Sequence, residues 1–203
     1  MMFLSEIQLN YSDMRRERIS DDYSIHRFVY SLFPVRNVSR RILYADMGAA
    51  ADGLHRTILV LSDEEPQPGE TIRFSTRIVS DDFLSFPDYR FLVAMNPVRK
   101  DPESGSRRPV LDHLDEWFCT RAPKWGFEVN MSYLEVFVRP ARSFMKNNAR
   151  TTFHRVDFSG RLHVTDPALF RRTFSAGLGH GKAFGFGLLQ LSPVYFDSHN
   201  LNP

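Results

Sequence analysis

The residues from Gly177 to Gly187, GLGHGKAFGFG, place five of the chain's 11 glycines in eleven positions. Glycine is found where the backbone takes a positive φ or passes very close to another group. The stretch follows a predicted helix that ends at Ala176 and precedes a predicted strand, Leu188–Leu191. It also contains a lysine and a histidine, so it predicts a loop whose backbone N–H groups surround an anion such as phosphate. The alternative is a helix C-cap at Gly177 followed by an unusual turn, but a cap requires only one glycine.

The spacing within this glycine-rich loop matches neither of two familiar phosphate loops. A P-loop requires a glycine, four further residues and then Gly-Lys-Ser or Gly-Lys-Thr, between a strand and a helix. Here Gly181-Lys182 is followed by Ala183, and the first glycine position holds Ala176. A dinucleotide-binding fingerprint fails as well, because it requires glycine where Lys182 stands. The sequence therefore does not predict a nucleotide loop of either kind.

Length and cysteine content limit the class of protein. A chain of 203 residues is enough for one large domain or two small ones, and 42% of it is hydrophobic, which supports a substantial core. The single cysteine, Cys119, excludes an internal disulfide and fits a reducing compartment. We recognise neither a signal peptide nor an apolar run of about 18 residues, so we expect a cytoplasmic protein without a membrane span.

The net charge of +2 hides an uneven distribution. Residues 1–137 carry 17 Lys and Arg against 21 Asp and Glu, whereas residues 138–203 carry 9 against 3. The basic stretch Val138–Arg155 contains no acid, and its basic members are Arg139, Arg142, Lys146, Arg150 and Arg155. Arginine predominates, with 22 Arg against 4 Lys, and its planar fork suits bidentate phosphate contacts. The pattern is that of a nucleic-acid-binding face, with a solvated basic surface as the alternative.

A predicted helix between Ser20 and Pro34 has two contrasting faces. We predict Ser20 as its N-cap, with acidic residues in the first turn and an end before Pro34. One stripe is apolar and consists of Ile25, Phe28, Val29 and Leu32; the opposite stripe consists of Tyr23, His26, Arg27 and Tyr30. A solvated face usually carries Lys, Glu and Gln. The second stripe is therefore a candidate for chemistry, with an exposed histidine of no consequence as the alternative.

The order of predicted elements indicates an α+β fold with antiparallel sheets. From residue 89 onward we predict a strand (89–97), a charged loop (98–108), a helix within 110–127, a strand (131–138), a hairpin in the basic stretch, a long strand (152–164), a helix opened by Pro167, and a last strand. This β-α-β-β-α-β order is that of ferredoxin-like, or RRM-like, domains. The first part begins with the alternating strand Phe3–Tyr11, continues through a polar loop that contains Arg15–Arg18, and lacks the second helix of the same order. We predict tandem ferredoxin-like domains, residues 1–87 and 88–203, of which the N-terminal one is partly degraded.

Two parts of the sequence resemble one known family. The glycine-rich loop, read on to Leu189, resembles that of CRISPR-associated endoribonucleases that process repeat RNA, and most of all the CasE (Cse3) branch of type I-E systems. Tyr23-Ser24-Ile25-His26, running on to Pro34, resembles the N-terminal helix of that branch. The resemblance includes both ends of the chain and the tandem layout.

The resemblance implies a metal-independent endoribonuclease without a cofactor. Such a protein cuts precursor CRISPR RNA within each repeat, stays bound to the repeat hairpin, and serves as a subunit of the Cascade complex. The resemblance assigns general acid/base catalysis to His26 and a supporting role to Tyr23.

The chemistry of these residues suits that reaction. RNA is cut without a metal when its own 2′-hydroxyl attacks the adjacent phosphate, which yields a 2′,3′-cyclic phosphate and a 5′-hydroxyl. Histidine can take the proton from the attacking hydroxyl or give one to the leaving oxygen, and the sequence does not decide between these roles for His26. Tyr23 can hydrogen-bond a phosphate oxygen, while Arg27, Lys182 and loop N–H groups can hold the developing charge.

RNA binding is predicted for Arg27, for the five basic residues of the basic stretch, and for the glycine-rich loop. The loop residues concerned are Gly177, Gly179, His180, Gly181, Lys182, Gly185 and Gly187, although His180 is equally well explained by local capping. No metal site is predicted, because there is no His-Glu-x-x-His motif and no cysteine pair. The main rival is a non-catalytic RNA-binding subunit of a CRISPR ribonucleoprotein, which would not need His26. A more distant rival is a nucleotide-binding regulatory domain of ferredoxin type.

Overall fold

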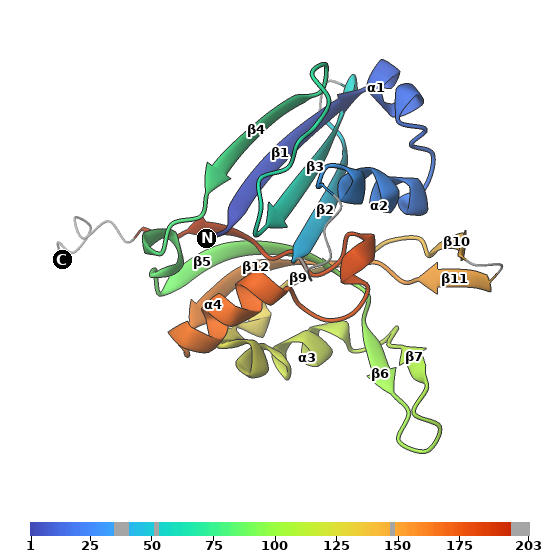
Figure 1. Cartoon of the computed structure of the whole chain (residues 1–203). Helices are drawn as coiled ribbons and strands as arrows, with labels where there is room; N and C mark the ends of the chain where they lie inside the picture. Colours follow the sequence, from blue (N-terminus) through green and yellow to red (C-terminus); the bar gives the residue numbers. More distant parts are fainter. Residues whose placement is uncertain (35–40, 51–52, 147–148, 196–203) are drawn as a thin grey trace.

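Two antiparallel sheets, each with helices on one face, form the frame of the protein (Figure 1). The computed structural model describes residues 1–34, 41–50, 53–146 and 149–195. The predicted α+β class and tandem ferredoxin-like arrangement are confirmed.

The first sheet contains four strands in the order β2-β3-β1-β4, which is the ferredoxin-like order. Its elements are β1 (Phe3–Asn10), α1 (Tyr11–Arg16), α2 (Asp22–Ser31), β2 (Ile42–Ala49), β3 (His55–Ser62) and β4 (Arg73–Ile78). The residues between β3 and β4 are all described and contain no helix, as predicted. The face of β4 that a second helix would cover therefore exposes Phe74 and Ile78.

Local capping at the start of the chain differs from the prediction. The N-cap of α2 is Asp21 and not Ser20, because the Asp21 carboxylate accepts the Ser24 N–H at 2.8 Å and the Ser24 hydroxyl oxygen accepts the Asp21 N–H. The expected polar loop that begins after β1 contains the short helix α1. Its own capping box links Asn10 and Asp13, and capping of this kind stabilises a turn that has little apolar periodicity.

The second sheet carries the order predicted for a complete ferredoxin-like unit, with added pieces. Its elements are β5 (Asp88–Met95), α3 (Leu114–Cys119), β8 (Phe127–Val129), β9 (Glu135–Val138), β12 (Val156–Val164), α4 (Pro167–Ala176) and β13 (Gln190–Pro193). Strand order is β13-β5-β12-β8, and β9 also pairs with β12. Asp166 caps α4 by accepting the Leu169 N–H at 2.9 Å, and Pro167 opens the helix, as predicted.

Two ribbons leave the second sheet on the same side of the molecule (Figure 1). One is the basic hairpin, β10 (Arg142–Lys146) paired with β11 (Ala149–Phe153), which confirms the predicted hairpin. The other is β6 (Val98–Lys100) paired with β7 (Arg107–Pro109), where a charged loop was predicted. The loop prediction was wrong because β6 and β7 are only three residues long, too short for an alternating pattern to be visible.

A single apolar cluster joins the two sheets. Leu43, Ala45 and Leu61, on the face of the first sheet away from α2, belong to the same cluster as Phe158 and Leu188 of the second sheet. A separate cluster lies between α2 and the other face of the first sheet. The strands of the two sheets occupy residues 3–78 and 88–193, and the division at residue 87 stays a prediction. No helix within the described residues is long and apolar enough to cross a membrane.

Candidate functional site

The polar stripe of α2 faces the glycine-rich loop, although the two are far apart in sequence. Nδ1 of His26 lies 2.6 Å from the carbonyl oxygen of Ala183. The His26 ring centre is 5.0 Å from that of Phe184, 4.4 Å from that of Tyr30 and 6.0 Å from that of Tyr23. The structure therefore brings together the two stretches that the sequence singled out.

This contact fixes the protonation pattern of the imidazole. A carbonyl oxygen only accepts hydrogen bonds, so Nδ1 of His26 carries a proton and donates a hydrogen bond to the Ala183 oxygen. The remaining nitrogen, Nε2, is an acceptor in the neutral ring and a donor in the charged ring. Nε2 is consequently the nitrogen able to exchange a proton with a bound substrate.

Phenol and guanidinium groups surround the imidazole. The Arg27 guanidinium carbon lies 5.8 Å from the centre of the Tyr23 ring, so a positive charge stands over this phenol. Tyr23 and His26 are half-buried, whereas Arg27 is exposed. Burial raises the pKa of Tyr30, which keeps its hydroxyl a donor at neutral pH.

The glycine-rich loop is held in place by contacts that only glycine permits. All five of its glycines have positive φ. A Cβ on Gly187 would lie 2.1 Å from the backbone oxygen of Leu178, and a Cβ on Gly185 would lie 2.9 Å from the Tyr44 ring. The loop is therefore packed directly on β2, and this close packing sets the position of the Ala183 carbonyl.

Several loop amides are used inside the protein. The N–H of Gly187 donates to Ala94 and that of Leu178 donates to Gly187, both at 2.8 Å. The Gly177 and Gly185 amides also donate to backbone carbonyls. The portion from Gly179 to Ala183 is thus the part of the loop best placed to meet an anion, and the role of the glycines in RNA binding stays a prediction.

The Lys182 ammonium is partly engaged at the end of a helix. Its Nζ donates to the carbonyl oxygen of Ala176, the last residue of α4, at 2.7 Å. A cation at a helix C-terminus is favourable because it opposes the helix dipole. Burial lowers the pKa of Lys182. Because Lys182 is held by the end of α4, this helix would set the distance between the Lys182 ammonium and a bound phosphate.

An ion-pair network anchors the basic hairpin to the first sheet and to α2. Arg142 lies 2.8 Å from the Asp22 carboxylate and 3.8 Å from that of Asp46. Asp46 is buried and accepts a hydrogen bond from Nε of Arg56 at 2.9 Å. Burial alone would raise the pKa of Asp46, but the Arg56 guanidinium outweighs it and the net shift is downward.

Asp157 is the second anchor of this hairpin. Arg139 donates to its carboxylate at 2.8 Å and Arg155 at 2.7 Å, and Arg155 also donates to the backbone oxygen of Asp46. Three of the five predicted RNA-binding residues of the basic stretch thus hold carboxylates, while keeping side-chain exposures of 54% (Arg139), 47% (Arg142) and 20% (Arg155). Lys146 and Arg150 lie on β10 and β11, and their side chains are outside the described part of the structure.

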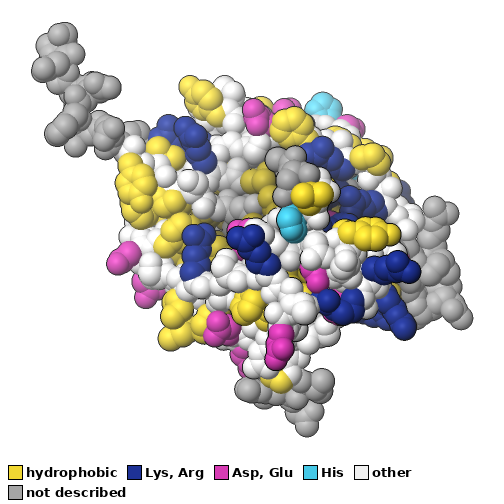
Figure 2. Space-filling model, turned by 90° about the horizontal axis from the view of Figure 1, so that it is seen from above, with side chains coloured by type: hydrophobic (Ala, Val, Ile, Leu, Met, Phe, Trp, Pro, Cys, Tyr) yellow, Lys and Arg dark blue, Asp and Glu magenta, His cyan; other side chains and the backbone are white. Residues whose placement is uncertain are grey.

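The sequence had not singled out Asp22, Asp46 or Asp157 as site residues. Arg142 pairs with Asp22 across 120 residues and lies near Asp46 across 96, so no local pattern could reveal these two contacts. Asp157 lies two residues from its partner Arg155, but an Arg-x-Asp spacing alone does not indicate an anchor. In the view from above, Lys and Arg side chains gather on the right, the side on which β10 and β11 project (Figure 2).

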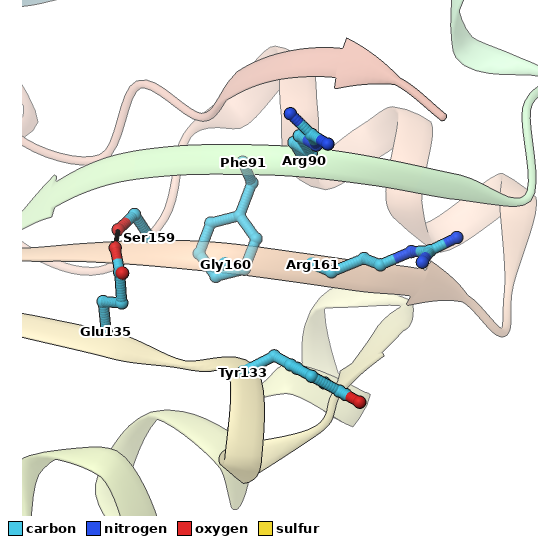
Figure 3. Close-up of a pocket in the computed structure, with 7 residues that line it drawn as sticks. All are labelled: Arg90, Phe91, Tyr133, Glu135, Ser159, Gly160 and Arg161. Atoms are coloured by element: carbon cyan, nitrogen blue, oxygen red, sulfur yellow. Dashed lines mark hydrogen bonds between the residues drawn. The ribbon is translucent and has the colours of Figure 1, made fainter. Parts of the chain in front are cut away.

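A separate hollow of about 550 Å³ lies on the second sheet (Figure 3). Arg90, Arg161, Tyr133 and Glu135 line it, and Glu135 accepts a hydrogen bond from Ser159 at 2.8 Å. None of the predicted site residues lines it. Within the described residues there is also no group of three His, Cys, Asp or Glu placed to hold a metal ion.

The fold and this site define a tandem ferredoxin-like protein in which a histidine-bearing helix, a glycine-rich loop and an arginine-rich hairpin meet. A family model described as "CRISPR associated protein" matches residues 2–193. The chain therefore belongs to this family of CRISPR-associated proteins, in agreement with the resemblance seen in the sequence.

Solved structures with the same fold were found, whereas no curated protein matches significantly. One is a CRISPR endoribonuclease Cse3 bound to a 19-nucleotide RNA, with a TM-score of 0.76, 22% identity and coverage of 95% of this chain and 100% of that one. Another is Cse3 from Thermus thermophilus bound to an RNA that represents a pre-cleavage complex (TM-score 0.77, 23% identity, 95% and 99% coverage). A third is a chain of a CRISPR RNA-guided surveillance complex in a pre-nicking state (TM-score 0.69, 18% identity, 95% and 100% coverage).

Proposed function

We propose that this protein is a metal-independent endoribonuclease that binds the CRISPR repeat hairpin and cuts precursor CRISPR RNA into mature guides. The observation that carries the proposal is the contact between His26 and Ala183, which leaves Nε2 of His26 as the proton-exchanging atom beside the glycine-rich loop. Proteins of this fold include an endoribonuclease bound to RNA and a chain of an RNA-guided complex, which supports the same reading. We further propose that the protein stays bound to its product as a Cascade subunit.

The proposed reaction balances without a cofactor. The 2′-oxygen of the nucleotide before the cut forms a bond to the phosphorus, its proton leaves, and the bond from phosphorus to the 5′-oxygen breaks. The leaving 5′-oxygen takes up a proton, so the products are a 2′,3′-cyclic phosphate and a 5′-hydroxyl. Nε2 of His26 carries out one of the two proton transfers, and such catalysis typically contributes about 10²- to 10⁴-fold.

The other residues of the stripe act on the phosphate. Tyr23, one turn before His26, can donate its hydroxyl proton to a phosphate oxygen. Arg27 stands over the Tyr23 ring and adds positive charge where the phosphorane becomes more negative. The exposed parts of the basic hairpin and the amides between Gly179 and Ala183 would hold the RNA backbone.

The test is cleavage of a synthetic RNA that carries the repeat of this organism's CRISPR array. We expect His26→Ala to lower the single-turnover cleavage rate at least 100-fold while the dissociation constant stays within about threefold. His163→Ala, an exposed histidine of the second sheet, is the control and should cut normally. A fully active His26→Ala protein would overturn the catalytic assignment.

Two further measurements address the chemistry. Wild-type cleavage in excess EDTA should proceed at the full rate, and a loss of activity that magnesium restores would contradict metal independence. A 2′-deoxy substitution at the nucleotide before the cut should block cleavage, and continued cutting would refute 2′-hydroxyl attack. A wild-type protein that binds the hairpin but never cuts it would favour the non-catalytic RNA-binding subunit.

A further inference from the structure

A positively charged groove lies on the side of the glycine-rich loop away from α2 (Figure 1). It has a volume of about 500 Å³ and is formed by β6, α3, the turn Ala122–Trp125 and the start of the loop. Its charged and aromatic lining consists of Lys100, Trp117, Arg121, Lys124, Trp125 and His180. We call it the cationic groove. Apart from His180, none of these residues was predicted to bind RNA.

The cationic groove differs from the basic hairpin in its charge balance. No carboxylate lines it. Lys100 and Lys124 are exposed, and within the described residues neither has an ion-pair partner. Arg142, Arg139 and Arg155 of the basic hairpin, by contrast, are each held by an aspartate. The cationic groove therefore presents unneutralised charge, which attracts anions.

Neighbouring groups add to this positive field. Burial, followed by the charge of Arg99, lowers the pKa of Arg121. Burial, followed by the charges of Arg107 and Lys182, lowers the pKa of His180. Cations from β6, β7 and the loop thus converge on one place, an arrangement that is stabilised when a polyanion binds.

The shape and aromatic content of the groove favour a single strand. Arg121 lies over the Trp117 ring, with its guanidinium carbon 4.4 Å from the ring centre, and so is held at the groove wall. Trp125 is half-buried and adds an aromatic surface next to the cations. Single-stranded nucleic acid is bound by this combination of a charged groove and aromatic rings. The groove has the size of a small-molecule pocket and is too small to admit a duplex.

The groove lies close to the candidate active site along the glycine-rich loop. His180 lies three residues before Ala183, whose carbonyl oxygen contacts His26. Three residues span at most about 10 Å, so the groove begins within that distance along the loop from the proposed cutting site. Figure 1 shows α2 on one side of the loop, and α3 with β6 and β7 on the other. A strand that leaves the cut and crosses the loop would enter the groove.

We propose that the cationic groove binds the phosphodiester backbone of the single-stranded RNA that flanks the repeat hairpin, on one side of the cut. Lys100 and Lys124 contact phosphates, and Arg121 and Trp125 form the wall against which the strand lies. This inference rests on the proposed function, because it requires a repeat hairpin held next to His26. It adds a binding site for the flank, separate from the basic hairpin.

The test compares two RNAs and two matched variants. One RNA is the repeat hairpin trimmed to the nucleotides around the cut, and the other carries longer single-stranded flanks; both contain 2′-deoxy at the nucleotide before the cut so that they stay intact. The variant Lys100→Gln/Lys124→Gln removes two charges from the groove. Arg15→Gln/Arg77→Gln removes two charges from exposed positions of α1 and β4 and serves as the control. Thermal unfolding of both variants checks that they are folded.

We expect the groove variant to bind the flanked RNA roughly tenfold more weakly than wild type, with the slope of log K against log salt reduced by about 1.4, or about 0.7 for each lost contact to a single strand. Its affinity for the trimmed hairpin should not change. RNAs with only a 5′ flank or only a 3′ flank then show which side is bound. An equal loss on trimmed and flanked RNA, or no loss on either, would overturn the inference.

The design separates this inference from the proposed function. Wild-type protein that neither binds nor cuts the hairpin would contradict the proposed function. Wild-type protein that binds the hairpin but gains no affinity from either flank would contradict the proposed role of the cationic groove and leave the proposed function standing. Cleavage by the groove variant of a trimmed RNA that retains only the nucleotides around the cut should remain at the wild-type rate.

Discussion

The imidazole of His26 donates from Nδ1 to the carbonyl oxygen of Ala183 across 2.6 Å, although 157 residues separate them. This contact joins the helix near one end of the chain to the loop near the other. The loop therefore acts on the proposed chemistry through the orientation of the imidazole, in addition to any contact it makes with RNA. Variants that shift the loop without touching His26 should reveal this role.

Gly185→Ala is the sharpest such variant. Gly185 has φ +83°, and an added Cβ would lie 2.9 Å from the buried Tyr44 ring, so either this ring or the segment that carries Ala183 and Phe184 must move. We expect a cleavage rate at least tenfold lower, with RNA affinity nearly unchanged, and a loss of about 2 kcal/mol of stability. Single-turnover kinetics and urea denaturation measure the two effects.

Gly53→Ala is the matched control for this prediction. Gly53 has φ +67° but nothing lies within 4 Å of its added Cβ, so the variant carries the backbone strain without the displacement. It should lose about 1 kcal/mol of stability and cut normally. Equal cleavage by Gly185→Ala and wild type would show that the loop does not position His26.

Asp46→Asn should loosen the attachment of the basic hairpin. Asp46 accepts hydrogen bonds from Arg56 and lies 3.8 Å from Arg142. The change therefore removes the carboxylate that pairs with Arg56 and leaves Arg142 with Asp22 alone. We expect a loss of about 2 kcal/mol in the free energy of unfolding at pH 7, measured by urea denaturation. Asp112→Asn, at an exposed position, should have no measurable effect.

The same variant has a predicted pH signature. Arg56 holds the pKa of Asp46 below its ordinary value in the folded protein. The stabilisation is therefore present above the unfolded-state pKa, near 4, and is lost as the pH falls through the lower folded-state pKa. The stability difference between wild type and Asp46→Asn should shrink below about pH 4. A difference that stays constant into acid would show that the ion pair is not its source.

Much of this arrangement could be predicted from local sequence, and the rest depends on distant partners. The opposing stripes of α2, the Asp166-Pro167 start of α4 and the dense glycines indicated the fold and the two halves of the site. The anchoring role of Asp22 was not predicted because Asp22 and Arg142 meet across 120 residues. The ribbon of β6 and β7 was not predicted because its strands are too short to show the alternating pattern of a β-strand.

RNA binding should depend on the protonation of His180. Burial and the charges of Arg107 and Lys182 lower its pKa, while Lys100 also lines the same groove, so the ring is neutral at pH 7 in the free protein. Phosphates in the groove would raise this pKa, and binding would then take up a proton. Affinity for the flanked RNA should therefore rise a few-fold as the pH falls from about 8 to about 6.

His180→Gln isolates this effect. The variant should bind the flanked RNA with an affinity that varies with pH only as much as the affinity for the trimmed hairpin does. Fluorescence anisotropy on RNAs with 2′-deoxy at the cut gives both profiles, and the trimmed RNA removes the contribution of His26. An unchanged pH dependence in His180→Gln would exclude His180 as the titrating group.

Tyr44→Phe tests an unsatisfied group beneath the loop. The Tyr44 hydroxyl is buried, and within the described residues it has no hydrogen-bond partner. Burial, followed by the charges of Asp22 and Asp46, raises its pKa, so the group stays a neutral donor at neutral pH. A buried hydroxyl without a partner costs about 1–3 kcal/mol, so its removal should leave stability unchanged or raise it by about 1 kcal/mol.

Tyr89→Phe is the contrasting variant. The Tyr89 hydroxyl is also buried, but it donates to the Phe83 carbonyl at 2.7 Å and accepts the Phe86 N–H at 3.1 Å. Its removal should cost about 1–2 kcal/mol. Urea denaturation of the two variants side by side measures the difference, and both should keep wild-type cleavage. If Tyr44→Phe lost as much stability as Tyr89→Phe, the Tyr44 hydroxyl would have a partner in the small hollow that Asp22, Asp46 and Tyr44 line. The hollow is so small that it holds a single water at most. That result would therefore place an ordered water between the loop and the hairpin anchor.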